Sequence, residues 1–156
     1  MSLKKRLTGW ISLLFLLAVL AGCDGPGTPS AGQNAGYTVT DAKNRQVKIL
    51  HKPERIVTLG LYTDEMVLGM VPTSKMAAVS HYLDDPKESV IVEKAKKIPN
   101  KVTDPTAEQI LSWQPDLVIA NGWTSDDKIQ TLTDMGIPVV VCGPANSYEE
   151  IQETLR

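Results

Sequence analysis

The sequence predicts an α/β fold in which a parallel sheet, built from βαβ units, carries helices on both faces. From residue 55 onward, short apolar runs alternate with segments that begin with helix-capping residues. Strict alternation of strand and helix is typical of parallel βαβ units. The apolar runs are continuous, which indicates strands buried on both faces. Right-handed crossovers then place helices on both sides of the sheet.

A β-hairpin is expected before this sheet. Tyr37–Thr40 and Arg45–Ile49 alternate along their length and flank the polar turn Asp41–Asn44. The sheet itself is expected to start with the short apolar strand Arg55–Leu59.

The first crossover helix follows this strand. Thr63 is predicted to cap a helix that ends near Met70, and Asp64 suits its first turn because acidic groups favour the N-terminal end of a helix dipole. Met76–Ser80 is the second predicted strand. A second helix is expected over Lys87–Lys97, although its caps are weak.

The third predicted helix has the clearest start signal in the chain. Thr106 and Gln109 form a capping box, and the helix runs through Trp113, which is expected to pack in the core. Pro115 then stops the helix, and Asp116–Ala120 is the third predicted strand.

A fourth helix and a fourth strand complete the pattern. Ser125 is predicted to cap a helix that runs to Met135, with Gly136 as its C-terminal stop. Ile137–Cys142 is the fourth predicted strand, and Ser147–Glu150 forms another capping box.

Residues 1–22 form a predicted export signal. The cations Lys4–Arg6 precede the apolar run Leu7–Ala21, which is shorter than the roughly 20 residues that span a bilayer. The end of this run, Leu20–Cys23, resembles the lipobox of bacterial lipoproteins, in which cleavage precedes a cysteine that becomes acylated. Cys23 is therefore the predicted lipidation site. The alternatives are an uncleaved membrane anchor and an ordinary signal peptide followed by a chance cysteine.

Residues 23–36 are predicted to form a flexible tether, because they are rich in small and polar residues and lack apolar periodicity. Residues 37–156 form the predicted folded lobe. The protein is thus expected in the cell envelope, lipid-anchored to the membrane and facing the periplasm or the extracellular side.

With Cys23 acylated, Cys142 is left alone. We expect it to be a small buried hydrophobe without a disulfide.

The composition and the motifs argue against several function classes. The 156 residues are 42% hydrophobic and 22% charged with a formal net charge of −2, values typical of one globular domain. The absence of a basic excess argues against a nucleic-acid binder. The sequence contains no Gly-x-Ser-x-Gly elbow and no His-Glu-x-x-His motif. Binding without turnover is therefore favoured over a small extracytoplasmic enzyme.

Ligands of open parallel sheets bind outside the carboxyl ends of the strands. In this chain, that rule selects the loops Gly60–Thr63, His81–Pro86 and Asn121–Ser125.

Three stretches carry a resemblance to a known family. They are Pro53–Gly60 with the helix start behind it, Thr106–Ala120, and Gly136–Val140. In order and spacing they resemble the substrate-binding proteins of ABC importers for ferric siderophores, haem and cobalamin. The hairpin and the lipoprotein tether match this family too.

The resemblance implies two α/β lobes that are joined by one long helix and hold a ligand between them, the present chain being the N-terminal lobe. Such a protein captures an iron–siderophore, haem or cobalamin-type ligand and delivers it to an ABC permease with its ATPase. No cofactor and no protein-bound metal are expected. By position, the residues that line the cleft would be Leu61, Tyr62, Thr63, His81, Tyr82, Asn121, Gly122 and Trp123.

Several of these assignments have alternatives. Glu108 matches a surface glutamate that docks onto arginines of the permease, but the helix dipole also favours a glutamate there. His81 and Tyr82 could ligate haem iron or lie at an exposed loop edge. The other cleft aromatics could pack against the helices of the lobe itself. Val102 stands where cobalamin binders carry an aromatic residue, which weakens the cobalamin interpretation.

The sequence ends at Arg156, inside the helix predicted after Ser147, so the linking helix and a second lobe are expected to be absent. One interpretation is a single lobe that works with a partner. The other is a truncated, non-functional fragment. An exposed apolar strip is expected near Ile151 and Leu155, where the linking helix of the family would pack.

Overall fold

The computed structural model describes residues 36–143 and residue 152. The predicted export signal, Cys23, nearly all of the tether, the capping box at Ser147 and the apolar strip near Ile151 and Leu155 lie outside the described residues. Within the described part, no helix combines the length and the apolar character needed to cross a membrane.

The predicted hairpin is confirmed. Strands β1 (Tyr37–Thr40) and β2 (Gln46–Ile49) pair antiparallel, with Tyr37 opposite Ile49. Asn44 in the turn has a φ of 58°, a left-handed conformation that asparagine tolerates better than most residues.

The hairpin is attached to the edge of the main sheet through Asp41. Its buried carboxylate accepts hydrogen bonds from the Arg45 guanidinium and, at 3.3 Å, from the Val141 amide. The Ala42 amide donates to the Val141 carbonyl at 3.0 Å. Burial raises the pKa of Asp41, but the hydrogen bonds from Arg45 and its neighbours outweigh this effect and hold the pKa below its ordinary value.

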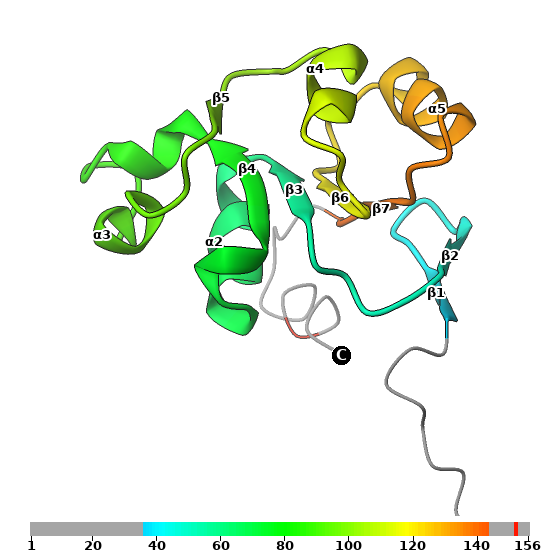
Figure 1. Cartoon of the computed structure of the whole chain (residues 1–156), viewed down its shortest axis with the longest axis horizontal. Helices are drawn as coiled ribbons and strands as arrows, with labels where there is room; N and C mark the ends of the chain where they lie inside the picture. Colours follow the sequence, from blue (N-terminus) through cyan, green and yellow to red (C-terminus); the bar gives the residue numbers. More distant parts are fainter. Residues whose placement is uncertain (1–35, 144–151, 153–156) are drawn as a thin grey trace, which may run out of the picture. The chain divides into compact units, whose positions relative to one another are not determined.

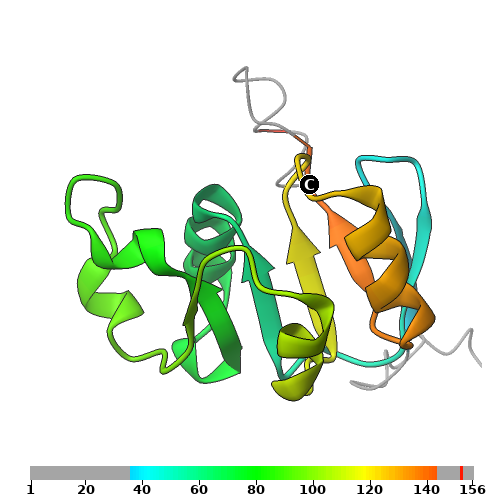
Figure 2. The ribbon, with the colours of Figure 1, turned by 90° about the horizontal axis from the view of Figure 1, so that it is seen from above.

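The main sheet is parallel, as predicted, and has five strands in the order β5-β4-β3-β6-β7. Figure 2 shows strands of the sheet running side by side in the same direction. Their bounds are β3 Ile56–Leu59, β4 Met76–Ser80, β5 Lys101–Val102, β6 Leu117–Ala120 and β7 Val139–Val141. The edge strand β5 was not predicted, because two residues leave no periodicity to detect. The chain goes outward from β3 to β5 and then returns to the other side of β3, so the strand order reverses between β3 and β6.

Helices cover both faces of the sheet, as predicted. In Figure 1, α4 and α5 lie on one side of the strands and α2 lies on the other. The bounds are α2 Leu61–Met70, α3 Val92–Ala95, α4 Ala107–Ser112 and α5 Asp126–Asp134, with 3₁₀ turns η2 at Thr73–Lys75 and η3 at His81–Asp84.

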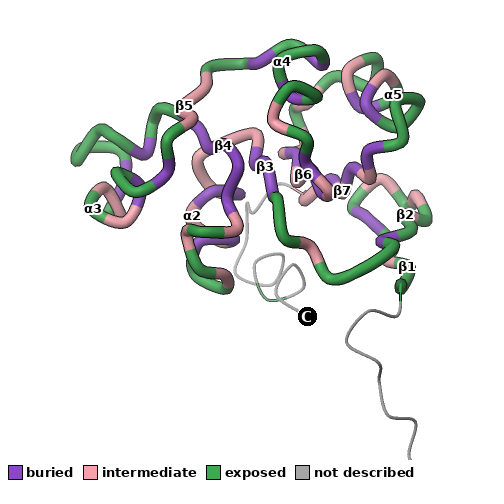
Figure 3. Tube along the Cα trace, viewed as in Figure 1, coloured by how far each residue is buried: buried purple, intermediate pink, exposed green. Residues whose placement is uncertain are grey.

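The core forms two clusters, one on each face. Val57 packs with residues of α4 and α5, whereas its neighbour Ile56 packs with α2 and α3. Val118 and Ile119 divide in the same way. Side chains of successive strand residues point to opposite faces, so a strand buried on both faces is apolar at most positions. Figure 3 shows the buried positions concentrated along these strands.

Two of the predicted caps are present and one prediction was wrong. Thr106 and Gln109 form the capping box of α4, and the Ser125 hydroxyl accepts the Lys128 amide at the start of α5. Helix α2, however, begins at Leu61 and has Gly60 as its N-cap. Thr63 lies inside the first turn and donates its hydroxyl to the Gly60 carbonyl at 2.8 Å. The turn that Gly60 makes possible starts the helix three residues earlier than predicted.

The helix predicted over Lys87–Lys97 is much shorter in the structure. Only Val92–Ala95 is α-helical, and turns occupy the residues before it. Side chains compete here with helical hydrogen bonding. The Asp85 carboxylate accepts the Lys87 amide at 2.9 Å, and the Ser89 hydroxyl donates to Glu65 on α2 at 2.7 Å.

Two further predictions concern the burial of single side chains, those of Trp113 and Cys142. Trp113 is partly buried against the core, as expected. Strand β7 stops at Val141, so Cys142 follows the strand and is only half-buried, which corrects the expectation of full burial.

Candidate functional site

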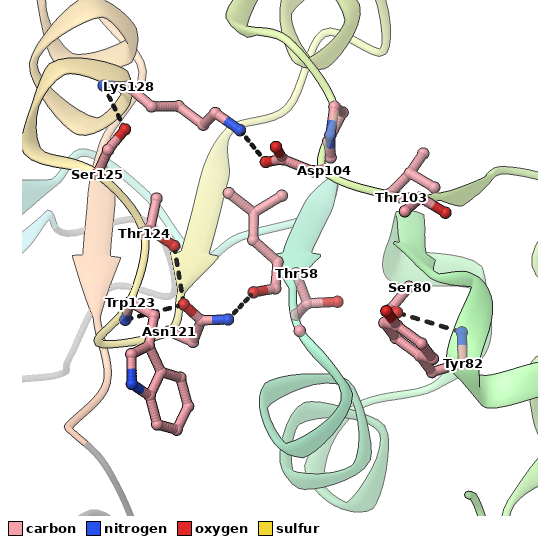
Figure 4. Close-up of a pocket in the computed structure, with 14 residues that line it drawn as sticks. Thr58, Ser80, Tyr82, Thr103, Asp104, Asn121, Trp123, Thr124, Ser125 and Lys128 are labelled. Carbon is pink, nitrogen blue, oxygen red and sulfur yellow. Dashed lines mark hydrogen bonds and ion pairs between the residues drawn. The ribbon is translucent and has the colours of Figure 1, made fainter.

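A pocket of about 420 Å³ opens at the carboxyl ends of the strands. It lies where the strand order reverses, which is the position expected for a ligand in an open parallel sheet. Figure 4 shows the side chains that converge on it from β3, β4, β5, α5 and the connecting loops, including the loop after β6. Five of the lining residues are serines or threonines: Thr58, Ser80, Thr103, Thr124 and Ser125.

A buried carboxyl group lies behind this polar lining. Asp64, which is fully buried, accepts a hydrogen bond from the Thr58 hydroxyl and one from the Ser80 amide at 3.0 Å. Burial raises the pKa of Asp64 to about 7, against the opposing effect of these two donors. Asp64 therefore joins the ends of β3 and β4 directly beneath the pocket.

Asn121 joins the ends of β3 and β6 in a similar way. Its amide nitrogen donates to the Leu59 carbonyl at 2.7 Å, and its oxygen accepts the Trp123 amide and the Thr124 hydroxyl, each at 3.1 Å. Both polar atoms of the Asn121 side chain are thus already engaged, the nitrogen with β3 and the oxygen within its own loop. Asn121 lines the pocket and holds the loop that carries Trp123.

Glycine is required at position 60, where the loops after β3 and β6 lie close together. Its φ of +142° is a conformation that side chains rarely adopt, and a Cβ atom there would lie 2.6 Å from the Asn121 amide nitrogen. The absence of a side chain lets the β3 and β6 loops approach each other.

Two aromatic residues border the pocket. Trp123 exposes 74% of its surface and Tyr82 exposes 48%, unusually high values for such large rings. The ring of Tyr62 meets that of Trp123 edge-on, with 6.3 Å between centroids and an interplanar angle of 84°. This contact supports the Trp123 ring from behind and leaves much of it available to a ligand.

The structure places three of the eight predicted cleft residues in the pocket lining, namely Tyr82, Asn121 and Trp123. The other five are Leu61, Tyr62, Thr63, His81 and Gly122. Thr63 is fully buried, and Leu61 packs against the α2 side of the core.

Tyr62 binds the segment that follows β7. Its hydroxyl donates to the carbonyls of Cys142 and Gly143 at 2.9 and 3.1 Å. Burial raises the pKa of Tyr62 to about 12, and its ring is the support of Trp123.

His81 lies exposed beside the pocket. Its Nδ1 is 2.7 Å from the Thr103 hydroxyl, and its ring lies 4.0 Å from that of Tyr82, measured between centroids. The described residues contain no cluster of three or more His, Cys, Asp or Glu side chains that could hold a metal ion.

Sequence reasoning missed the side of the pocket formed by Thr103, Asp104 and Lys128. The first two follow β5, so the rule of carboxyl ends would have selected them had this strand been recognised. Lys128 lies in the first turn of α5 and carries no sequence signal of its own. Val102, which the sequence analysis compared with an aromatic position, also lines the pocket.

Glu108 is exposed in the first turn of α4 and does not line the pocket. Hydrogen bonds from its own amide and from Thr106 lower its pKa. This geometry suits helix capping and leaves the carboxylate accessible to another molecule.

The chain is similar to known proteins in sequence. A model of the family described as periplasmic binding protein matches residues 56–156. An uncharacterized ABC transporter substrate-binding lipoprotein of Bacillus subtilis (strain 168), YvrC, is 31% identical over 163 residues. The match covers 99% of this chain and 50% of YvrC, so the chain spans about half the length of the curated relative it matches.

Solved structures share the fold. The heme binding protein HmuT has a TM-score of 0.63 at 22% identity, over 85% of this chain and 42% of HmuT. The molybdate periplasmic binding protein MolA of Haemophilus influenzae has a TM-score of 0.58 at 22% identity, over 69% of this chain and 34% of MolA. The α/β unit described above thus corresponds to one lobe of longer, two-lobed proteins.

Proposed function

Because the chain belongs to the periplasmic binding protein family, we propose that it is the extracytoplasmic substrate-binding component of an ABC importer. It captures a small ligand without turnover and delivers it to the permease, which works with its ATPase. The observation that carries the proposal is the pocket at the carboxyl ends of β3, β4 and β6, with its polar lining and exposed aromatic rim. The family description also favours a binding protein over an enzyme.

The proposed ligand is an iron–siderophore, haem or cobalamin-type compound. Exposed rings such as that of Trp123 bury large area against a planar or bulky ligand, while the hydroxyl groups behind them satisfy its polar atoms. Val102 lines the pocket, at the position where cobalamin binders carry an aromatic residue. Because this difference lies in the site itself, cobalamin is the least favoured of the three ligands.

The direct ligand contacts proposed are Tyr82 and Trp123. Asn121, Tyr62 and the backbone around Gly122 hold the loop that carries Trp123 in place. Leu61 and Thr63 act through the packing of α2. His81 lies at the rim, where its Nε2 could reach a large ligand.

Delivery requires an anchor and a docking surface. We place the lipid anchor at Cys23, behind the signal at residues 1–22, with residues 23–36 as the tether of the lobe 37–156. This locates the lobe on the outer side of the membrane. Glu108, exposed on α4, is the proposed contact with arginines of the permease. An exposed ion pair of this kind contributes about 0.2–1 kcal/mol, so it orients the docked protein more than it holds it.

Equilibrium titration of the full chain, purified in detergent, tests the proposal. The probes are haem, N-acetyl ferrioxamine B and cyanocobalamin. We expect one of them to bind, and Trp123→Ala to weaken its binding about tenfold, which corresponds to about 1.4 kcal/mol.

The matched control is Tyr37→Ala, which removes an aromatic residue that is 48% exposed but lies on β1, outside the pocket lining. It should bind like the wild type. If none of the probes binds, the alternative of a non-functional fragment gains support. Equal losses in the two variants would argue against the pocket.

A further inference from the structure

The pocket lining carries two charged side chains, and they are paired with each other. The ammonium group of Lys128, on α5, contacts the carboxylate of Asp104, in the loop after β5. Figure 4 shows the Lys128 side chain extending along one side of the pocket to reach Asp104. The remaining lining residues are uncharged at neutral pH.

The two partners differ sharply in their contact with water. The Lys128 side chain is 19% exposed, whereas that of Asp104 is 87% exposed. A pair with one fully hydrated partner contributes little to stability. Asp104 can therefore turn into solvent at small cost, but Lys128 would then be left largely shielded from water and without an anion.

We propose that Lys128 binds an anionic oxygen of the ligand and that Asp104 is the resting counter-ion which this oxygen displaces. The inference rests on the proposed function and narrows it. The preferred ligand is a chelate or tetrapyrrole with a carboxylate or another deprotonated oxygen at its edge. An uncharged analogue of the same ligand cannot replace Asp104 and binds less tightly.

A purely structural role for the pair makes different predictions. In that case the pair would only fasten α5 to the loop after β5. Removing either partner would then loosen the pocket and weaken the binding of charged and uncharged ligands alike. In our proposal, Asp104→Asn frees Lys128 and strengthens the binding of the charged ligand.

The chain provides a matched control pair. Lys101 on β5 contacts Asp84 on η3, with side chains 18% and 48% exposed. Neither residue lines the pocket. Asp84→Asn therefore breaks an ion pair of the same type without altering the charge of the pocket lining.

The test compares ligands that differ in their carboxylate groups. The full chain in detergent is titrated with N-succinyl ferrioxamine B, which carries a free carboxylate, and with the uncharged N-acetyl ferrioxamine B. Haem and its dimethyl ester form a second pair. We expect the wild type to prefer the acid of a pair about tenfold, and the preference to shrink as salt is raised.

The variants assign this preference to Lys128. Lys128→Gln should abolish the preference by weakening the binding of the acid alone, whereas Lys128→Arg should retain the preference. Asp104→Asn should increase the preference, and Asp84→Asn should leave it unchanged. Equal binding of acid and neutral partner, or a preference that survives Lys128→Gln, overturns this inference and leaves the proposed function standing. If only cyanocobalamin binds, this inference fails and the proposed function stands. If neither the four probes nor cyanocobalamin binds, the proposed function fails, and this inference fails with it.

Discussion

At the scale of single residues, the most consequential group is the carboxyl group of Asp64, which does not line the pocket. Asp64 is buried beneath the pocket and holds the ends of β3 and β4 through Thr58 and Ser80. The sequence indicates an acidic residue suited to the first turn of a helix. It does not indicate burial, because burial depends on strands that come from two other parts of the chain.

The raised pKa of Asp64 makes a prediction about stability. The group has a pKa of about 7 in the folded state and about 3.8 as its ordinary value, so the folded state holds the proton more tightly. Stability should therefore fall as pH rises from about 4 to about 7 and level off above that, with a slope of at most about 1.4 kcal/mol per pH unit.

Denaturant unfolding of the wild type and of Asp64→Asn at pH 5, 6, 7 and 8 measures this effect. The asparagine can keep both hydrogen bonds, since its oxygen can accept the Ser80 amide and its nitrogen can donate to Thr58. We expect the variant to lose the pH dependence. Glu88→Gln, at an exposed carboxyl group, should follow the wild type. Parallel pH profiles for wild type and Asp64→Asn would show that Asp64 does not titrate in this range.

At the scale of elements, a buried carboxylate lies at the centre of the contacts that hold hairpin β1–β2 to β7. The Asp41 side chain is inaccessible to solvent and accepts hydrogen bonds both from its own turn and from the edge strand. An edge strand presents unpaired backbone groups, and the hairpin satisfies some of those of β7.

Asp41→Asn should destabilise the protein by about 1–3 kcal/mol at pH 7, because the new amide group would face the Arg45 guanidinium and the Val141 amide, which are both donors. Chemical denaturation measures the loss. Gln46→Ala, which removes the exposed 2.7 Å contact with Thr40 in the same hairpin, is the control and should cost far less. Equal small losses in the two variants would contradict the role of Asp41.

The sequence predicted elements best where the signal was local. The capping box at Thr106, the Ser125 cap and the Gly136 stop, with its φ of 82°, were read from neighbouring residues and are confirmed. The start of α2 was predicted wrongly, because the turn at Gly60 begins the helix before Thr63. The extent of α3 was predicted wrongly, because the residues before it form other hydrogen bonds, such as that of Ser89 with Glu65, 24 residues away. Strand β5 was too short to predict.

At the scale of the whole molecule, the fold class followed from alternation of strand and helix, and the position of the site followed from topology. The residues of the site were harder to predict. The rule that ligands bind at the carboxyl ends of strands identified the loop that contains Asn121 and Trp123. It could not show that both polar atoms of the Asn121 side chain already form hydrogen bonds within the protein. Lys128 could not be predicted, since its contact with Asp104 joins segments that are 24 residues apart.

The central claim is that a ligand binds at the carboxyl ends of the strands. Hydrogen exchange of the full chain, with and without haem, N-acetyl ferrioxamine B or cyanocobalamin, tests it most directly. The account predicts that one ligand slows backbone exchange at Thr103 and Asp104 and in Asn121–Ser125, while the hairpin Tyr37–Ile49 is unaffected. Unchanged exchange with every ligand, or protection confined to segments outside the pocket, would contradict it.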